Sequence, residues 1–128
     1  MTTWAELQSY VRGNYKVVAE TDAQLAVLFQ FDSGRTQQAS ITLERMVDHD
    51  WVCISSAFGA VGEVDVTKAL EMLDARIFGA IGRDGEVYVV KHSALLADMD
   101  GKELEYPLLL TLAVAEELES KVSLGDKF

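Results

Sequence analysis

Apolar and polar residues recur with two different periods along this chain, and the change of period predicts where helices give way to strands. The first period is helical, because Trp4, Leu7 and Val11 follow one another at spacings of three and four residues. Thr3 precedes this stretch and has capping-box spacing to the acidic residue three positions on. We therefore expect a helix that begins after Thr3 and ends at Gly13-Asn14.

Four consecutive strands are expected over residues 15–21, 25–31, 39–44 and 51–58, and the second and third of them alternate with a period of two. Asp32-Ser33-Gly34-Arg35 predicts a hairpin turn, because glycine readily adopts a positive φ. His49-Asp50 interrupts the pattern and predicts the turn before the fourth strand. Since the fourth strand carries little polarity on either side, we expect it to be central in the sheet.

The second half of the chain predicts two more helices around another hairpin. Asp65 is suited to cap a helix whose core face is formed by Val66, Ala69, Leu70 and Leu73. Strands are expected over 77–82 and 86–92, joined at Arg83-Asp84-Gly85-Glu86, where the Asp-Gly pair is a strong hairpin signal.

The last helix is expected to end near Val122, and its start has two interpretations. Asp100 could cap it together with Glu103, which would place Pro107 inside the helix and favour a kink. Alternatively, the helix begins near Tyr106, where proline is well tolerated in the first turn. The order is α-β-β-β-β-α-β-β-α in one domain, residues 1–128, and its hairpin-length links predict an antiparallel α+β fold with helices on one face.

The acidic composition argues against some classes of binding partner. The 128 residues carry a formal net charge of -10, which repels phosphate backbones and anionic lipids, so we expect neither a nucleic-acid nor a membrane partner. The first residues lack the pattern of a secretory signal, and the longest apolar stretch, 107–115, is too short to span a bilayer. The expected location is the cytoplasm. Cys53, the one cysteine, lies in an apolar run and is expected to be a buried core residue.

Candidate chemistry is sparse. His49 and His92 are far apart and begin no metal-binding spacing, and residues 98–103 provide too few spaced oxygen donors for a calcium loop. Ser55-Ser56 and Ser93 lack the glycine-flanked turn that exposes a nucleophilic serine. The sequence therefore predicts no catalytic residue, no metal site and no cofactor, and we expect a protein that is not an enzyme.

The last helix has more apolar surface than one side of a sheet can cover. A core-facing stripe is formed by Leu108, Thr111, Leu112, Ala115, Leu118 and Val122. Four further apolar residues lie outside it: Leu109, Leu110, Ala113 and Val114. Either the first helix covers them within the monomer, or they contact another subunit or a partner protein. Carboxylates at 116, 117 and 119 border this patch, which is typical of a symmetric dimer or a reversible protein contact.

Several short motifs, spread over nearly the whole chain, resemble one family. They are Trp4-x-x-Leu7, Gly34-Arg35-x-Gln37, Trp51-x-x-Ile54-Ser55-Ser56, Ala69-Leu70, Ala115-Glu116-x-Leu118-Glu119 and Gly125-Asp126-x-Phe128. Together they resemble the bacterial YbjN-like domains, a family of proposed sensory transduction regulators. The fold of that family is similar to that of type III secretion chaperones, which are small, acidic, dimeric proteins that hold an effector in extended form.

The resemblance implies a chaperone-like or regulatory protein with a protein partner, in addition to self-association. It also implies apolar contact surfaces for an effector, to which Phe29, Phe31 and Met72 would contribute, although both phenylalanines are better explained as core. Arg35 could bind an acidic group or could be a solvated turn charge. The family provides no catalytic residues.

Two functions remain open on the sequence alone. The first is a non-enzymatic, dimeric protein-binding domain that uses Leu109, Leu110, Ala113, Val114 and Met72. The second is a small-molecule-binding domain, or a minor enzyme, with a pocket between sheet and helices near Trp51, Tyr88 and His92.

Overall fold

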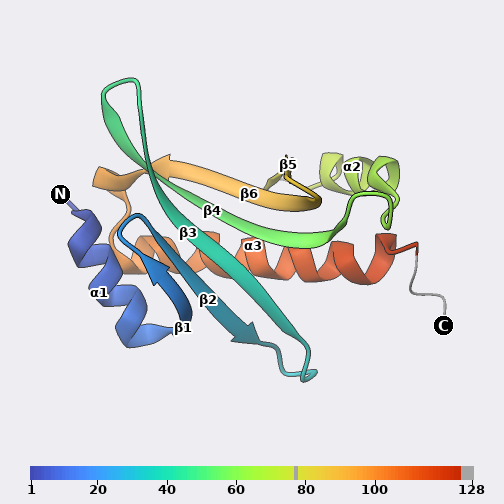
Figure 1. Cartoon of the computed structure of the whole chain (residues 1–128), viewed down its shortest axis with the longest axis horizontal. Coiled ribbons are helices and arrows are strands. Elements are labelled where there is room, and N and C mark those ends of the chain that lie inside the picture. The colour runs from blue at the N-terminus through green and yellow to red at the C-terminus, as the bar shows by residue number, and fades with distance from the viewer. Residues whose placement is uncertain (77, 125–128) are drawn as a thin grey trace.

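The computed structural model describes residues 1–76 and 78–124, and in these residues the helices and strands follow the predicted order (Figure 1). The elements are α1 (Trp4–Asn14), β1 (Lys16–Thr21), β2 (Gln24–Gln30), β3 (Thr36–Met46), β4 (His49–Ala60), α2 (Val66–Asp74), β5 (Ala80–Asp84), β6 (Val87–Leu95), a short 3-10 turn (Leu96–Asp98) and α3 (Gly101–Val122). Ile77, which was predicted to begin the fifth strand, and the Gly125-Asp126-x-Phe128 motif lie outside the described residues.

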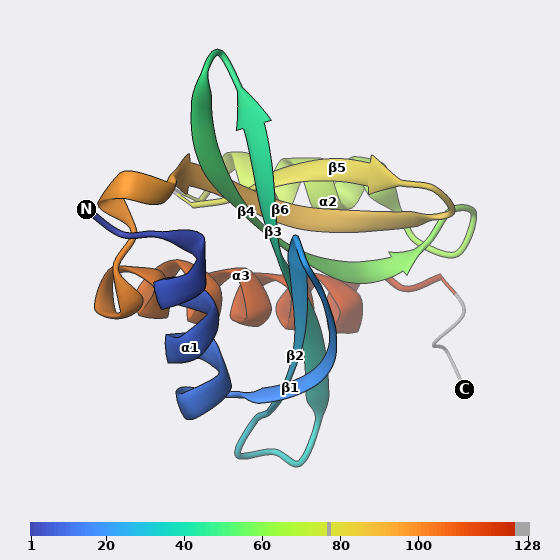
Figure 2. The same cartoon turned by 60° about the vertical axis from the view of Figure 1, so that its left-hand side comes forward.

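All six strands form one antiparallel sheet in the order β1-β2-β3-β4-β6-β5. The α+β class and the expected central position of β4 are confirmed, because β4 pairs with β3 on one side and with β6 on the other. α3 runs along one face of the sheet, with α1 near its beginning and α2 near its end (Figures 1 and 2). None of the helices in the described residues combines the length and apolar content that crossing a membrane requires.

The core consists of two clusters on the helix-bearing face, and α3 contributes to both. The first cluster packs Leu104, Leu108 and Leu112 of α3 against α1 and the strands β2 to β4. The second packs Ala115, Leu118 and Val122 of α3 against α2, β4 and β6. Each of these six α3 side chains is at least nine-tenths buried, so α3 links the two halves of the core.

Capping residues define the helix starts as predicted. The backbone N–H of Glu6 donates to Thr3 Oγ1 at 3.2 Å, and the Thr3 N–H donates to the Glu6 carboxylate at 3.1 Å, which completes a capping box. Asp65 Oδ1 accepts from the Lys68 N–H at 3.1 Å. Asp100 Oδ1 accepts from the Glu103 N–H at 2.8 Å, which resolves the start of α3 in favour of this cap.

Pro107 lies inside α3, seven positions after its cap. Proline has no N–H to donate to the preceding turn. One turn later, the buried Thr111 hydroxyl donates to the Pro107 carbonyl at 2.7 Å. The helix nevertheless continues through the proline to Val122, so its whole length is available to cover the sheet.

Gly101 allows α1 to pack closely on the start of α3. A Cβ atom on Gly101 would lie 2.2 Å from Cδ2 of the Tyr10 ring, so no other residue fits there without displacing Tyr10. α1 therefore lies against the first turn of α3, and it leaves the middle of α3 uncovered on the side away from the sheet.

Three predictions about individual positions are wrong. Cys53 is half-buried on the helix-free face, because it alternates with Val52 and Ile54, which occupy the core side of β4. Leu70 is 53% exposed, because the short α2 buries only Ala69 fully. The turn between β3 and β4 is formed by Val47-Asp48, since His49 and Asp50 pair with Met46 and Arg45.

The β3–β4 hairpin extends beyond the rest of the sheet and ends in an unusual turn (Figure 2). Val47 and Asp48 adopt φ values of 52° and 59°, the left-handed region that this two-residue turn requires. A β-branched residue is strained there, and asparagine or glycine is preferred. Val47 is also 78% exposed, so it gains little burial in compensation.

We predict that Val47→Asn stabilises the protein by about 1 kcal/mol and raises Tm by a few degrees, because asparagine tolerates the left-handed conformation. Thermal unfolding followed by circular dichroism measures this. Val18→Asn is the control, since Val18 is an exposed valine at the bulge of the edge strand β1 and has no positive φ. A lower Tm for Val47→Asn would show that the turn is not strained.

Candidate functional site

The side of α3 that faces away from the sheet is apolar near its middle. Leu110 is 42% exposed, and Tyr106, one turn earlier, is 75% exposed. Ala113 is exposed one turn later. A single helical surface thus presents apolar groups to solvent at the i, i+4 and i+7 positions that normally face a core.

A groove of about 330 Å³ lies between this side of α3 and the segment that links α2 to β5. We call it the outer groove, and it is lined by Arg76, Phe78, Leu110, Ala113, Val114 and Glu117. Most of its exposed surface is apolar. Its size is at the lower end of ordinary ligand pockets, and its open shape suits an inserted side chain.

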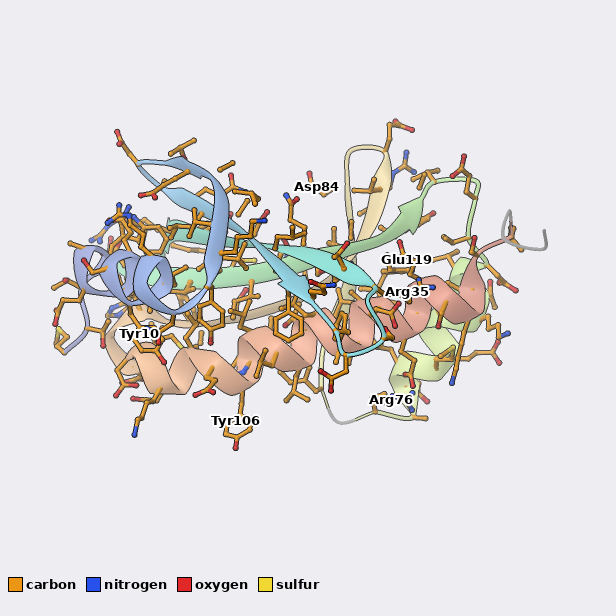
Figure 3. The ribbon with its side chains drawn as sticks, turned by 90° about the horizontal axis from the view of Figure 1, so that it is seen from below. Tyr10, Arg35, Arg76, Asp84, Tyr106 and Glu119 are labelled. Carbon is orange, nitrogen blue, oxygen red and sulfur yellow. The ribbon has the colours of Figure 1, made fainter. Side chains whose placement is uncertain are left out.

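Two features give the outer groove a defined wall. Phe78 stacks on the His92 ring, with centroids 4.9 Å apart and an interplanar angle of 24°. Arg76 forms an ion pair with Glu117, which Lys121 also approaches at 3.7 Å (Figure 3 labels Arg76). The ion pair connects the α2–β5 segment to α3, so the groove is a structured feature of the surface.

The five residues expected at an interface have different surroundings. Leu110, Ala113 and Val114 line the outer groove. Leu109 is half-buried and packs against the first core cluster. Met72 is half-buried and packs against the second. The structure thus places three of the five together.

The motifs that carried the family resemblance contact one another. Arg35, in the β2–β3 turn, pairs with Glu116 and, at 3.4 Å, with Glu119 of α3 (Figure 3). The Glu116 oxygen that faces Arg35 is buried and is held by charge, without a well-aligned hydrogen bond. Gln37 Nε2 donates to Ser56 Oγ at 2.9 Å inside the protein. These motifs therefore connect the β2–β3 hairpin to α3 and to β4.

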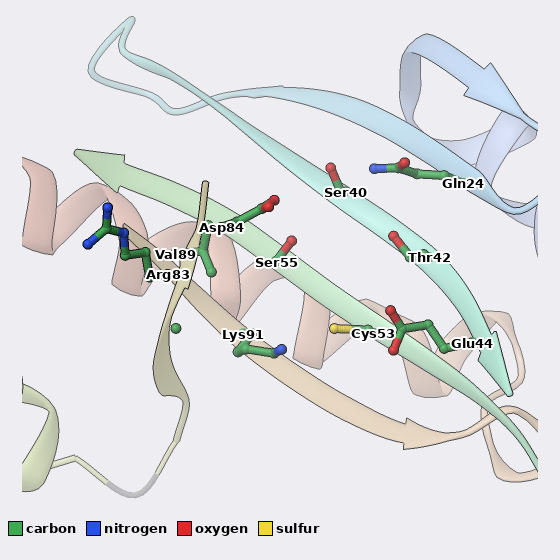
Figure 4. A pocket seen from close by; sticks show the side chains of 11 residues that line it. Gln24, Ser40, Thr42, Glu44, Cys53, Ser55, Arg83, Asp84, Val89 and Lys91 are labelled. Atoms are coloured by element: carbon green, nitrogen blue, oxygen red, sulfur yellow. The ribbon is translucent and has the colours of Figure 1, made fainter. Parts of the chain in front are cut away.

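The opposite face of the sheet has a different character. A trough of about 360 Å³ is lined there by small polar side chains and a few charges (Figure 4). Ser40, Thr42, Cys53 and Ser55 contribute from β3 and β4, and Lys91 contributes from β6. Such a surface is typical of the solvated face of an antiparallel sheet.

The three residues of the expected small-molecule pocket have different surroundings. Trp51 shares the helix-free face with Glu44, its partner in β3, and its indole N–H donates to the Met46 carbonyl at 2.9 Å. Tyr88 stacks on Phe58 in the second core cluster, and His92 stacks on Phe78 near the outer groove. The outer groove and the trough on the helix-free face are lined by other residues.

Within residues 1–76 and 78–124, no group of three or more His, Cys, Asp or Glu side chains is arranged to hold a metal ion. Asp100 and Glu103, in the segment compared with a calcium loop, form the cap of α3. Ser55 and Ser56 point to opposite faces of the sheet, and Ser56 donates to the Gln38 carbonyl at 2.7 Å. Ser56 is thus part of a hydrogen bond between β3 and β4, and Ser55 is one of the polar residues of the trough.

Sequence patterns did not identify Arg76, Phe78 and Glu117 as groove residues. Arg76 and Phe78 follow α2 in an irregular segment, where periodicity carries no information about contacts. Glu117 was predicted only as part of an acidic border. The ion pair that links Arg76 to Glu117 joins positions 41 residues apart and could not be inferred from local spacing.

Comparison with known proteins supports the fold. One chain of a solved structure titled "Structure of the HopA1-SchA Chaperone-Effector Complex" superposes with a TM-score of 0.62, covering 91% of this chain and 91% of that chain at 9% identity. The structure therefore has a type III secretion chaperone-like fold. No family model matches the sequence. No curated protein matches it either.

The Arg76–Glu117 pair generates a prediction for acid stability. A hydrogen bond from Arg76 lowers the pKa of Glu117 below its ordinary value of 4.5, and burial opposes this only in part. The pair therefore stabilises the fold above about pH 4.5, and this contribution is lost as the pH falls through the lowered pKa. We expect Tm to fall less between about pH 5 and pH 3 in Glu117→Gln than in the wild type.

Thermal unfolding at a series of pH values tests this expectation. Glu105→Gln is the matched control, because Glu105 is an exposed carboxylate of α3 with no ion-pair partner among the described residues. The same acid sensitivity in Glu117→Gln as in Glu105→Gln would mean that the pair does not stabilise the groove wall.

Proposed function

We propose that this protein is a non-enzymatic protein-binding domain, a chaperone-like or regulatory adaptor of the cytoplasm, which docks partners through the outer groove. The observation that carries the proposal is the groove itself. Leu110 and Ala113 remain exposed at its centre although the two core clusters are complete without them. An apolar patch with a charged border is typical of a protein contact in a protein of this size.

Charge supports a reversible protein contact at this place. The chain carries a net charge of -10, which keeps a protein with an exposed apolar patch in solution. At the groove, Arg76 and Lys121 both lie against Glu117, so this carboxylate is paired. A partner could therefore bury Leu110 without burying an unpaired charge, which is the main penalty in forming an interface.

The fold adds independent support. The similar solved structure is, by its title, a chaperone–effector complex, and the two chains match over 91% of their lengths. We extend protein binding from that complex to this chain as a proposal, together with self-association into a homodimer. The polar trough on the other face has no comparable apolar centre, so the groove is the better docking surface.

The test is affinity capture from the native cell extract. We expect the tagged wild type to retain a protein partner and Leu110→Glu to lose it, because a buried, unpaired carboxylate at the groove centre opposes docking. Mass spectrometry identifies the retained proteins.

Leu70→Glu is the matched control, since Leu70 is an exposed leucine of α2 that does not line the groove. It should retain the partner as the wild type does. Equal retention by Leu110→Glu and the wild type would exclude the groove as the docking surface, and failure of every folded form to retain any protein would contradict protein binding.

A further inference from the structure

The outer groove combines an apolar lining with a charged end. The apolar lining comes from four side chains: Phe78, Leu110, Ala113 and Val114. Arg76 and Glu117 complete the groove and form an ion pair with each other. Leu110 and Glu117 are about two turns, or ~10 Å, apart along α3. A ligand that lay along α3 would therefore have apolar contacts over most of its length and ionic contacts at one end.

The charged end carries more positive than negative charge. One carboxylate oxygen of Glu117 pairs with Arg76, and Lys121 approaches the other oxygen at 3.7 Å. Of the described residues that line the groove, Glu117 alone is acidic. Two cations thus face a single carboxylate, although the chain as a whole has a net charge of -10. The groove is locally suited to an anion.

Arg76 has hydrogen-bond donors that its ion pair does not use. Its Nη2 contacts Glu117, whereas Nε and Nη1 take part in no hydrogen bond or ion pair within the described residues. The side chain is 39% exposed, so a ligand in the groove can reach it. A guanidinium presents several N–H donors in one plane, which allows it to bind more than one carboxylate oxygen at a time. A second carboxylate can therefore bind Arg76 while Glu117 stays in place.

We propose that the outer groove binds a small amphipathic carboxylate, with its carboxylate on Arg76 and its apolar body against Leu110 and Val114. The groove volume of about 330 Å³ equals that of roughly ten water molecules in the liquid, so the ligand has on the order of ten non-hydrogen atoms. A free medium-chain alkanoate has this size and chemistry. The inference goes beyond protein docking and does not depend on it.

The head group of the ligand follows from the charges at the groove. A bound carboxylate would place two anions beside Arg76 and Lys121, which balances the local charge. An ammonium head group would instead add a third cation, which is unfavourable. A neutral hydroxyl would keep the apolar contacts and lose the charge-assisted hydrogen bonds to Arg76.

The proposed ligand would cover the same surface as a docked protein. Leu110 is 42% exposed and lines the groove, so the alkyl chain of the ligand and the side chain of a partner would both bury it. The two would therefore compete, and the concentration of the carboxylate would control how much partner is bound.

Isothermal titration calorimetry of the full chain tests the ligand chemistry. The probe is octanoate, and octan-1-ol and octylammonium are comparisons with the same alkyl chain. We expect saturable binding of octanoate, and about tenfold or more weaker binding of the other two. Equal affinity for all three, or no binding of octanoate, would overturn the proposal.

Two substitutions with opposite expected effects test the role of charge. Arg76→Gln should weaken octanoate binding by about tenfold or more, because the charge-assisted hydrogen bonds are lost. Glu117→Gln should tighten it by a few-fold, because the competing carboxylate is removed and both cations then face the ligand. Damage to the shape of the groove would weaken binding in both variants, so weakening in both would contradict the proposal.

Arg83→Gln is the matched control, since Arg83 is an exposed arginine that approaches Glu86 at 3.9 Å and does not line the groove. It should bind octanoate as the wild type does. Amide chemical shifts locate the bound ligand, and we expect the largest changes at Ala113 and Val114. Changes confined to residues outside the groove would exclude it as the site.

Affinity capture separates this inference from the proposed function. Octanoate binding by a protein that retains no partner would support the ligand site and contradict protein docking. Loss of a captured partner in Leu110→Glu, with no octanoate binding by the wild type, would overturn the ligand site and leave the proposed function standing.

Discussion

A single helix, α3, packs against the sheet in both core clusters, and only one side of a helix can face a sheet. α3 is 22 residues long, or about 33 Å, and it contributes to both core clusters. Every apolar residue beyond the core-facing stripe must be covered by something else or stay in water. Leu109 packs against the first core cluster, whereas Leu110 and Ala113 stay exposed. The candidate site is therefore a consequence of how the sheet is covered.

Contacts from distant parts of the chain hold α3 in this position. The ring of Tyr10 lies where a Cβ of Gly101 would be, so α1 is fixed against the first turn of the helix. Near the other end, Arg35 reaches Glu116 and Glu119 from the β2–β3 hairpin, and Arg76 reaches Glu117 from the segment after α2. Such exposed or half-exposed pairs contribute modestly to stability, and they join α3 to the β2–β3 hairpin and to the segment after α2.

The sequence predicted features that depend on local chemistry better than features that depend on distant contacts. The caps at Thr3, Asp65 and Asp100 and the surplus apolar residues of the last helix follow from spacing along one helix. The Val47-Asp48 turn was missed because nothing local favours a valine at positive φ. Cys53 was misplaced because an apolar run does not reveal which of its residues face the core. Arg76 and Phe78 could not be predicted as groove residues, because their contacts with α3 arise only from tertiary packing.

The central claim is that another protein surface covers the outer side of α3 in solution. Hydroxyl-radical footprinting tests this directly, because Tyr106 is 75% exposed in the single chain and is readily oxidised when accessible. Met46, which is 61% exposed at the β3–β4 hairpin, reports the dose of radicals. The account predicts that Tyr106 is protected in the wild type and becomes oxidised in Ala113→Glu, at equal oxidation of Met46. Equal oxidation of Tyr106 in both proteins would contradict it.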